Sequence, residues 1–200
     1  MKRIACLLLI SMLIFSTSIS CKEKQSVRRE VEKNNVKKGK KNTIKPMKKT
    51  SEKSEELKRF PLNDTKGILT KNGVSFDKTT SKDGKGSLKL VATKETVFKL
   101  FKLTGFSLDN AKLLYKAQLK CKDVKGKAYL EMWVVTPDNK RFFSKGLNAP
   151  LEGTIDWTTK EIPFFLKKGE KINKIEINLV IKGTGTVWID DIIITKNPLN

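Results

Sequence analysis

The chain has 200 residues, with 42 lysines and arginines against 21 aspartates and glutamates, a formal net charge of +21 and no histidine. The absence of histidine excludes a Ser-His-Asp triad and removes the commonest general base and zinc ligand. Of the cysteines at positions 6, 21 and 121, only Cys121 falls in the expected folded part, so no disulfide is predicted there.

Residues 1–20 have the pattern of a secretory signal peptide. Lys2 and Arg3 precede an apolar run from Ile4 to Phe15, which has the length of a signal-peptide core. The run is too short to span a bilayer, which takes about 20 apolar residues. We therefore expect segment 1–20 to be removed from the mature protein.

The next segment, Ser18-Ile-Ser-Cys21, resembles the lipobox of bacterial lipoproteins. The resemblance implies that the chain is cleaved before Cys21 and that a lipid (palmitate and related acyl chains) on this cysteine anchors it to the membrane. An ordinary secretory peptide with an incidental cysteine is the alternative. Lys22 stands where aspartate would retain a lipoprotein in the inner membrane of enteric-type bacteria, so we expect residence at the outer membrane, cell surface or periplasm.

Residues 21–59 read as a disordered, lysine-rich tether. This stretch carries 15 Lys and Arg against 6 Asp and Glu and lacks sustained apolar periodicity, so it cannot bury enough surface to fold. We expect it to lie near anionic head groups as a solvated segment. Nucleic acid is not the expected partner, because an export signal precedes the tether and its cations lack interleaved aromatics.

Residues 60–200 are expected to form one all-β domain. Short runs of β-branched and aromatic residues alternate with Gly, Asn, Asp and Pro, which is typical of a sandwich or barrel. In one run Leu113, Tyr115 and Leu119 alternate with polar residues, and Cys121 continues the apolar side as a small buried residue. The predicted strands are 87–93, 112–121, 127–135, 174–181 and 186–194.

Three segments together resemble the galactose-binding-like jelly rolls of carbohydrate-binding modules: 83–90 (DGKGSLKL), 153–163 (GTIDWTTKEIP) and 183–194 (GTGTVWIDDIII). The resemblance implies a two-sheet antiparallel β-sandwich. In that family one sheet often forms a concave face that takes sugar, and a structural calcium can sit at the edge of the sandwich.

One strand carries the candidate sugar site. If Ala128, Leu130, Met132 and Val134 fill the core, Tyr129, Glu131 and Trp133 project together from the other face, where two aromatics would flank a carboxylate. Neighbouring strands could add polar groups: Gln118 and Lys120, or Glu176 and Asn178. The alternative is that Tyr129 and Trp133 only cover the sheet.

The remaining aromatics of the domain have other expected positions. Phe142 and Phe143 follow a predicted turn at 138–141, so we expect one at a rim and the other in the core. Trp157 and Trp188 are assigned to packing.

The adjacent carboxylates in the last strand suggest a cation site. Two acids in an apolar strand are costly unless they are paired, hydrogen-bonded or bound to a cation, and calcium prefers such oxygen ligands. In the resembling modules a late-strand aspartate joins oxygens from the N-terminal region, which makes the candidate ligands Asp64, Asp83, Asp190 and Asp191. The alternative is that one aspartate points to water while the other accepts turn amides or pairs with lysine.

These observations favour a non-catalytic, membrane-anchored lipoprotein whose sandwich binds carbohydrate. We expect no enzymatic activity, because neither a histidine, a phosphate-binding loop nor an opposed pair of carboxylates is evident. The alternative is a surface adhesin or structural envelope lipoprotein that binds an envelope or host protein through the same sandwich. The protein is expected to be a monomer.

Overall fold

The computed structural model describes residues 53–106 and 108–199, and the regular secondary structure in these ranges is all β. The predicted signal peptide, the lipidation of Cys21 and the predicted tether as far as residue 52 lie outside these ranges. No helix in the described ranges is long and apolar enough to cross a membrane. The strands are β1 (Glu55–Phe60), β2 (Val74–Asp77), β3 (Ser87–Ala92), β4 (Thr96–Thr104), β5 (Ala111–Val135), β6 (Arg141–Lys145), β7 (Leu151–Leu166) and β8 (Lys174–Pro198).

The first strand begins earlier than the sequence suggested. The predicted tether extended to Arg59, but the chain joins the sheet at Glu55, where β1 pairs antiparallel with β8. The physical reason is that Leu57 and Phe60 pack against the hydrophobic core. The lysines and glutamates around these two residues make the segment too polar overall to be recognised as a strand from the sequence. The first described strand therefore begins at Glu55, within the segment expected to belong to the tether.

Two long strands organise the fold. β5 and β8 pair antiparallel along almost their whole length, and the register shifts between Lys122 and Lys125. There Gly126 and Gly183 have positive φ, and a Cβ on either would overlap a carbonyl oxygen of the opposite strand. Only glycine permits this approach, so the two strands bend together at this point.

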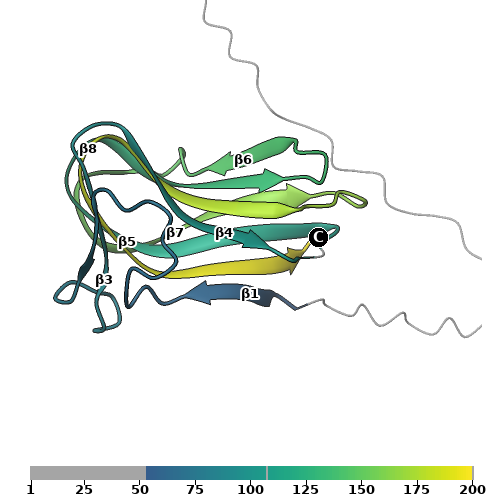
Figure 1. Cartoon of the computed structure of the whole chain (residues 1–200), viewed down its shortest axis with the longest axis horizontal. Coiled ribbons are helices and arrows are strands. Elements are labelled where there is room, and N and C mark those ends of the chain that lie inside the picture. Colours follow the sequence, from purple (N-terminus) through teal and green to yellow (C-terminus); the bar gives the residue numbers. More distant parts are fainter. Residues whose placement is uncertain (1–52, 107, 200) are drawn as a thin grey trace, which may run out of the picture. The chain divides into compact units, whose positions relative to one another are not determined.

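The bend creates two layers that share β5 and β8, as Figure 1 shows, with β6 in the upper layer and β1 in the lower one. Layer A contains β1, β2, β3 and β7 with residues 111–122 of β5 and 186–198 of β8. Layer B contains β4 and β6 with residues 127–135 of β5 and 174–182 of β8. The protein is thus an all-β antiparallel sandwich, as predicted, in which hydrogen bonding continues from one layer into the other.

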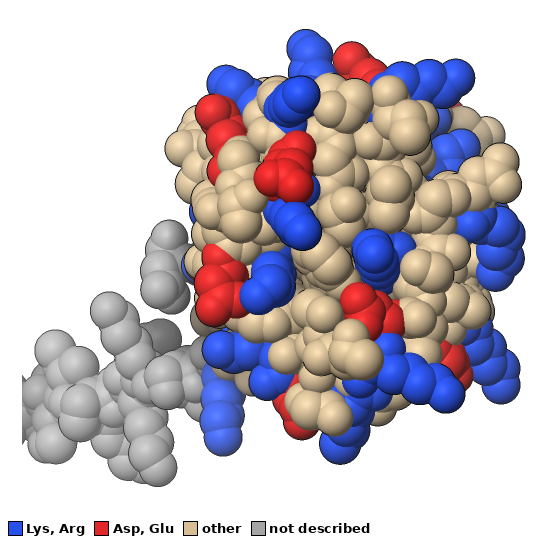
Figure 2. Space-filling view, turned by 90° about the vertical axis from the view of Figure 1, so that its left-hand side faces the viewer, with Lys and Arg blue, Asp and Glu red and all other residues tan. Residues whose placement is uncertain are grey.

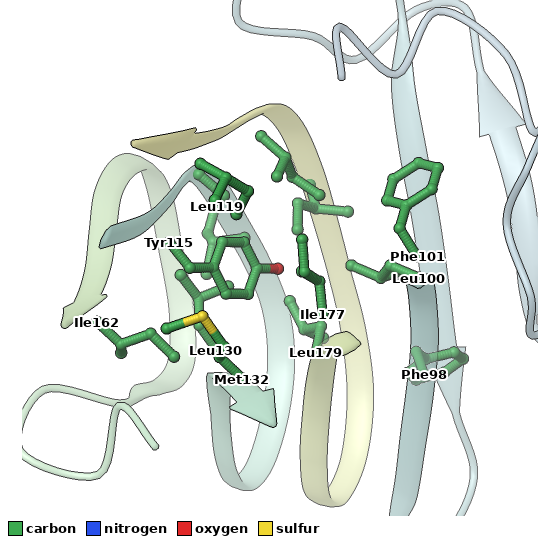
Figure 3. Close-up of a cluster of buried hydrophobic side chains, with 14 of the residues drawn as sticks. Phe98, Leu100, Phe101, Tyr115, Leu119, Leu130, Met132, Ile162, Ile177 and Leu179 are labelled. Atoms are coloured by element: carbon green, nitrogen blue, oxygen red, sulfur yellow. The ribbon is translucent and has the colours of Figure 1, made fainter. Parts of the chain in front are cut away.

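The core lies between the layers. Period-two alternation directs one side of each strand inward, so that Tyr115 and Leu119 of layer A meet Met132 and Ile177 of layer B (Figure 3). The buried Tyr115 hydroxyl donates a hydrogen bond to the carbonyl oxygen of Asn178 across the interior, at 3.4 Å. Cys121 is buried and free, as predicted, and burial raises the pKa of its thiol.

Candidate functional site

The candidate sugar-binding strand has the predicted alternation. Ala128, Leu130, Met132 and Val134 belong to the core, whereas Tyr129, Glu131 and Trp133 project from the other side of layer B. The strand order on this side is β4-β8-β5-β6, so β8 and β6 flank the three side chains. We term this surface the B face. The side chains on it that matter below are Tyr129, Glu131, Trp133, Arg141, Phe143, Lys145, Glu176 and Asn178.

Glu131 lies at the centre of a closed hydrogen-bond network. Its Oε1 accepts hydrogen bonds from Trp133 Nε1 at 2.8 Å and from Asn178 Nδ2 at 3.0 Å. Its Oε2 lies 3.1 Å from Lys145 Nζ. The residue is only 4% exposed, and a carboxylate at such depth requires partners of this kind. The network fixes the positions of the indole, the amide and the ammonium group around it.

The Trp133 ring is in contact with side chains of β6. Phe143 lies directly opposite in the strand register, with 5.2 Å between ring centroids and planes inclined by 57°. Arg141 Cζ is 4.6 Å from the centroid of the indole and Lys145 Nζ is 5.8 Å from it, both within cation–π range. Trp133 is half-buried by these neighbours, and Phe143 is 57% exposed. Phe143 is therefore the open ring of the B face.

A second carboxylate, Glu176, lies beside Trp133 on β8. Its oxygens are 2.7 Å from Arg141 Nη2 and 2.7 Å from Lys174 Nζ. Partial burial opposes ionisation, but the hydrogen bond from Lys174 and the charges of Lys174, Arg141 and Lys99 outweigh it and hold the pKa of Glu176 below its usual value. This side chain is a fixed negative charge near neutral pH.

Two of the predicted site residues do not serve as expected. Gln118 is not part of the B face: it lies in layer A, where its Nε2 donates to Thr159 Oγ1 of β7 at 3.0 Å. Segments 112–121 and 127–135, taken as separate strands, are one bent strand, and the bend separates Gln118 from Tyr129. Tyr129 is on the B face but only 8% exposed, and burial raises the pKa of its phenol, so it offers no open ring.

Sequence reasoning missed the contribution of β6 to this site. We expected one of Phe142 and Phe143 to enter the core, and this is wrong: they are 48% and 57% exposed, because β6 is an edge strand and projects them to opposite sides. Phe143 joins the B face. The signal that could have found it is the alternation Arg141, Phe143, Lys145 after the turn.

Phe142 faces a groove between the edge strands β6 and β7. The groove has a volume of about 300 Å³ and is also lined by Val134, Phe164, Phe165 and Ile172. Charged side chains at its rim are Asp138, Lys140, Glu170 and Lys171. Phe165 is 58% exposed, so the groove is a second apolar depression beside the B face.

The four carboxylates predicted to bind calcium are not brought into one group: Asp64, Asp83, Asp190 and Asp191. No cluster of three or more metal-binding side chains occurs in the described part of the chain. Asp190 is fully buried and accepts hydrogen bonds from the backbone amides of Lys82 at 2.9 Å and Asp191 at 2.8 Å. Asp191 turns the other way, to Arg59 at 2.7 Å.

The remaining two carboxylates have local roles as well. Asp64 and Asp83 each accept a hydrogen bond from the backbone amide two residues further on, at 2.7 Å and 2.8 Å. Backbone amides and an arginine thus satisfy these carboxylates, so Asp190 accepts amides as in the alternative to calcium, and Asp191 pairs with arginine where that alternative has water or lysine. Within the described residues these four side chains do not form a calcium site.

Comparison with known proteins bears on the fold. No protein-family model and no curated protein matches the chain. Among solved structures, the CBM22-1 and GH10 modules of xylanase 10B from Clostridium thermocellum, complexed with xylohexaose, match with a TM-score of 0.52 and 13% identity over 70% of this chain and 28% of that chain.

Two isolated modules give lower scores. The CBM22-1 xylan-binding domain of Xyn10C from Paenibacillus barcinonensis has a TM-score of 0.49 and 15% identity, over 74% of this chain and 94% of that chain. A family 16 carbohydrate-binding module has a TM-score of 0.46 and 14% identity, over 61% and 84% respectively. The match to the xylanase 10B modules defines the class as a β-sandwich of the kind found in carbohydrate-binding modules, and an identity this low concerns the fold alone.

Proposed function

We propose that the domain is a non-catalytic carbohydrate-binding domain whose B face receives the sugar. The observation that carries the proposal is the exposed Phe143 ring beside Trp133, surrounded by charged groups already held in place. Sugar recognition requires an aromatic ring for the apolar face of a pyranose and polar groups for its hydroxyls. The B face supplies the aromatic ring and the polar groups side by side, on paired positions of β5, β6 and β8.

Preorganisation strengthens this assignment. Arg141 is held between the Trp133 ring and Glu176, and Lys145 between Glu131 and the rings of Trp133 and Phe143. Side chains that are already ordered lose little conformational entropy when a ligand binds; each flexible one would cost about 0.5–1.5 kcal/mol. The B face can therefore bind a small ligand without rearrangement.

A hydrolytic role is disfavoured by the state of the two carboxylates. A glycosidase needs one carboxylic acid that holds a proton near neutral pH. The lowered pKa of Glu176 is the opposite of this requirement, and Glu131 is enclosed by three donors. The B face is suited to holding a sugar rather than cleaving it.

The test compares two neighbouring phenylalanines. Phe142→Ala and Phe143→Ala remove rings of similar exposure from opposite sides of β6, so they serve as matched controls for one another. On a glycan array followed by titration calorimetry, the proposal expects Phe143→Ala to weaken binding about tenfold or more, with little effect of Phe142→Ala. If Phe142→Ala weakens binding and Phe143→Ala does not, the sugar binds in the groove between β6 and β7 instead of on the B face. Capture of a protein partner with no glycan bound would favour the adhesin or envelope-structure alternative.

We also propose that Cys21 carries the lipid that anchors the domain to a membrane. The support is the lipobox-like segment and the lysine-rich stretch that follows it. Metabolic labelling with an alkyne fatty acid should label the full chain and not Cys21→Ser. Equal labelling of both would exclude this anchor.

A further inference from the structure

We infer that the ligand of the B face is an acidic glycan, one that carries carboxylate, sulfate or phosphate groups. This inference rests on the proposed function and specifies the chemical class of the ligand. It follows from the balance of charge and of hydrogen-bond donors and acceptors on this face.

Cations outnumber carboxylates on the B face. Lys99 and Lys102 of β4 stand opposite Asn178 and Glu176 of β8 in the strand register, and both are exposed. With Arg141, Lys145 and Lys174 they make five cations. The carboxylates are Glu131 and Glu176, together with Glu95 at the β3–β4 turn. The charge of Glu95 contributes to the raised pKa of the Tyr129 phenol. The face therefore has a positive excess.

The acceptors at the centre of the face are already in use, whereas Glu95 is exposed at its β3–β4 end. Glu131 and Glu176 are both ion-paired and hydrogen-bonded within the protein. The neutral acceptors closest to them, on Asn178 and Tyr129, belong to residues that are 5% and 8% exposed. A neutral sugar hydroxyl both donates and accepts, so it needs free acceptors, which the centre of this face around Trp133 does not offer among the described side chains.

The donors, by contrast, have spare capacity. An ammonium group has three donors and a guanidinium five, and no ion pair within the described ranges involves Lys99 or Lys102. The matching ligand has many acceptors and negative charge. Phe143 would stack on its ring while the lysines bind its acidic groups.

Positive charge elsewhere has a different arrangement. Figure 2 views the end of the domain where β5 and β8 bend, and there lysines and arginines are distributed around the rim and interspersed with acidic residues. Lys122 and Lys125 lie at this bend, are exposed, and take part in no ion pair of the described residues. They provide a charge-matched control remote from the B face.

The experiment uses the full chain, polygalacturonate oligomers and the same oligomers after reduction of their carboxyl groups. We expect the acidic form to bind about tenfold more tightly than the reduced form, and the difference to shrink as NaCl is raised from 50 to 500 mM. Lys99→Gln/Lys102→Gln should lose about tenfold in affinity for the acidic form, and Lys122→Gln/Lys125→Gln less than about twofold.

Each result has one reading. Equal binding of acidic and reduced oligomers would overturn the acidic-ligand inference while leaving the proposed function standing. Equal losses in the two double variants would overturn it as well, because attraction by the basic chain as a whole would then explain binding. If neither the acidic nor the reduced oligomers bind and the glycan array yields no ligand, the proposed function fails with it.

Discussion

Two tryptophans on opposite outer faces of the sandwich have nearly the same local chemistry. Trp133 Nε1 donates to Glu131 and Trp188 Nε1 to Asp77, each at 2.8 Å. A lysine lies over each ring, Lys145 at 5.8 Å and Lys89 at 5.6 Å. Yet Trp188 is 8% exposed, whereas Trp133 is half-buried and adjoins the open Phe143 ring.

The difference lies in what each hydrogen bond connects. Asp77 ends β2, far from Trp188 in sequence, so this bond ties an edge strand to the centre of layer A. Glu131 is two residues from Trp133 on the same strand, so that bond joins no separate elements and only orients the indole. We conclude that Trp188 stabilises the fold, whereas Trp133 belongs to the surface proposed to bind sugar.

Substituting the buried tryptophan should have the largest effect on stability. Trp188→Ala is expected to lower the free energy of unfolding by about 3–5 kcal/mol, because it removes a buried ring and leaves Asp77 without its indole donor. Urea denaturation followed by circular dichroism measures the change. A loss no greater than that of Trp133→Ala would contradict the contrast between the two residues.

The buried carboxylate of layer A provides the next test. Burial is the main cause that raises the pKa of the Asp190 carboxyl. Asp190→Asn removes the buried charge, but the NH₂ group of the asparagine would then face one of the two backbone N–H donors. We expect a destabilisation of about 1–3 kcal/mol, from the hydrogen bond lost. Increased stability in thermal melts would show that burial of the charge dominates instead.

The pH dependence of stability should depend on Asp77. The hydrogen bond from Trp188, followed by those from Thr79, lowers the pKa of Asp77 below the usual 3.8. Because the folded pKa is the lower one, the stabilisation is complete above about pH 5 and is lost as the pH falls further. Asp77→Asn should cost about 1–2 kcal/mol at pH 7. The difference in the free energy of unfolding between this variant and the parent protein should become smaller below about pH 4, as measured by denaturation at a series of acid pH values.

The smallest effect is expected on the B face. Trp133→Phe keeps an aromatic ring but removes the indole donor, and Glu131 retains Asn178 and Lys145. We expect a loss of about 1 kcal/mol or less in stability. A loss equal to that of Trp188→Ala would give both tryptophans the same structural role.

Much of the fold could be predicted from the sequence because it depends on period-two alternation. Leu113, Tyr115 and Leu119, and then Leu130 and Met132, are buried as their spacing indicated. The same alternation placed Glu131 and Trp133 on one side of the strand. Asn178 lies on the same side and donates a hydrogen bond to Glu131, because their two strands are neighbours in the sheet.

The rest depended on pairing across long sequence separations. No local pattern reveals that two predicted runs are halves of one strand, which is why Gln118 was assigned to the wrong layer. Arg141, Phe143 and Lys145 reach the site through the register of β6 on β5, which hydropathy does not encode. The partners of Asp190 and Asp191 likewise come from Lys82 and Arg59, both distant along the chain.

The close approach of Gly126 and Gly183 has a consequence for how the domain can come apart. One antiparallel ribbon, folded in half, forms the middle of both layers, so neither layer is a separable lobe. Deleting β8 would remove the centre of both layers at once. A side chain at Gly126 or Gly183 would push β5 and β8 apart and so disturb both layers. Unfolding should accordingly be a single all-or-none event, with no half-sandwich surviving as an intermediate.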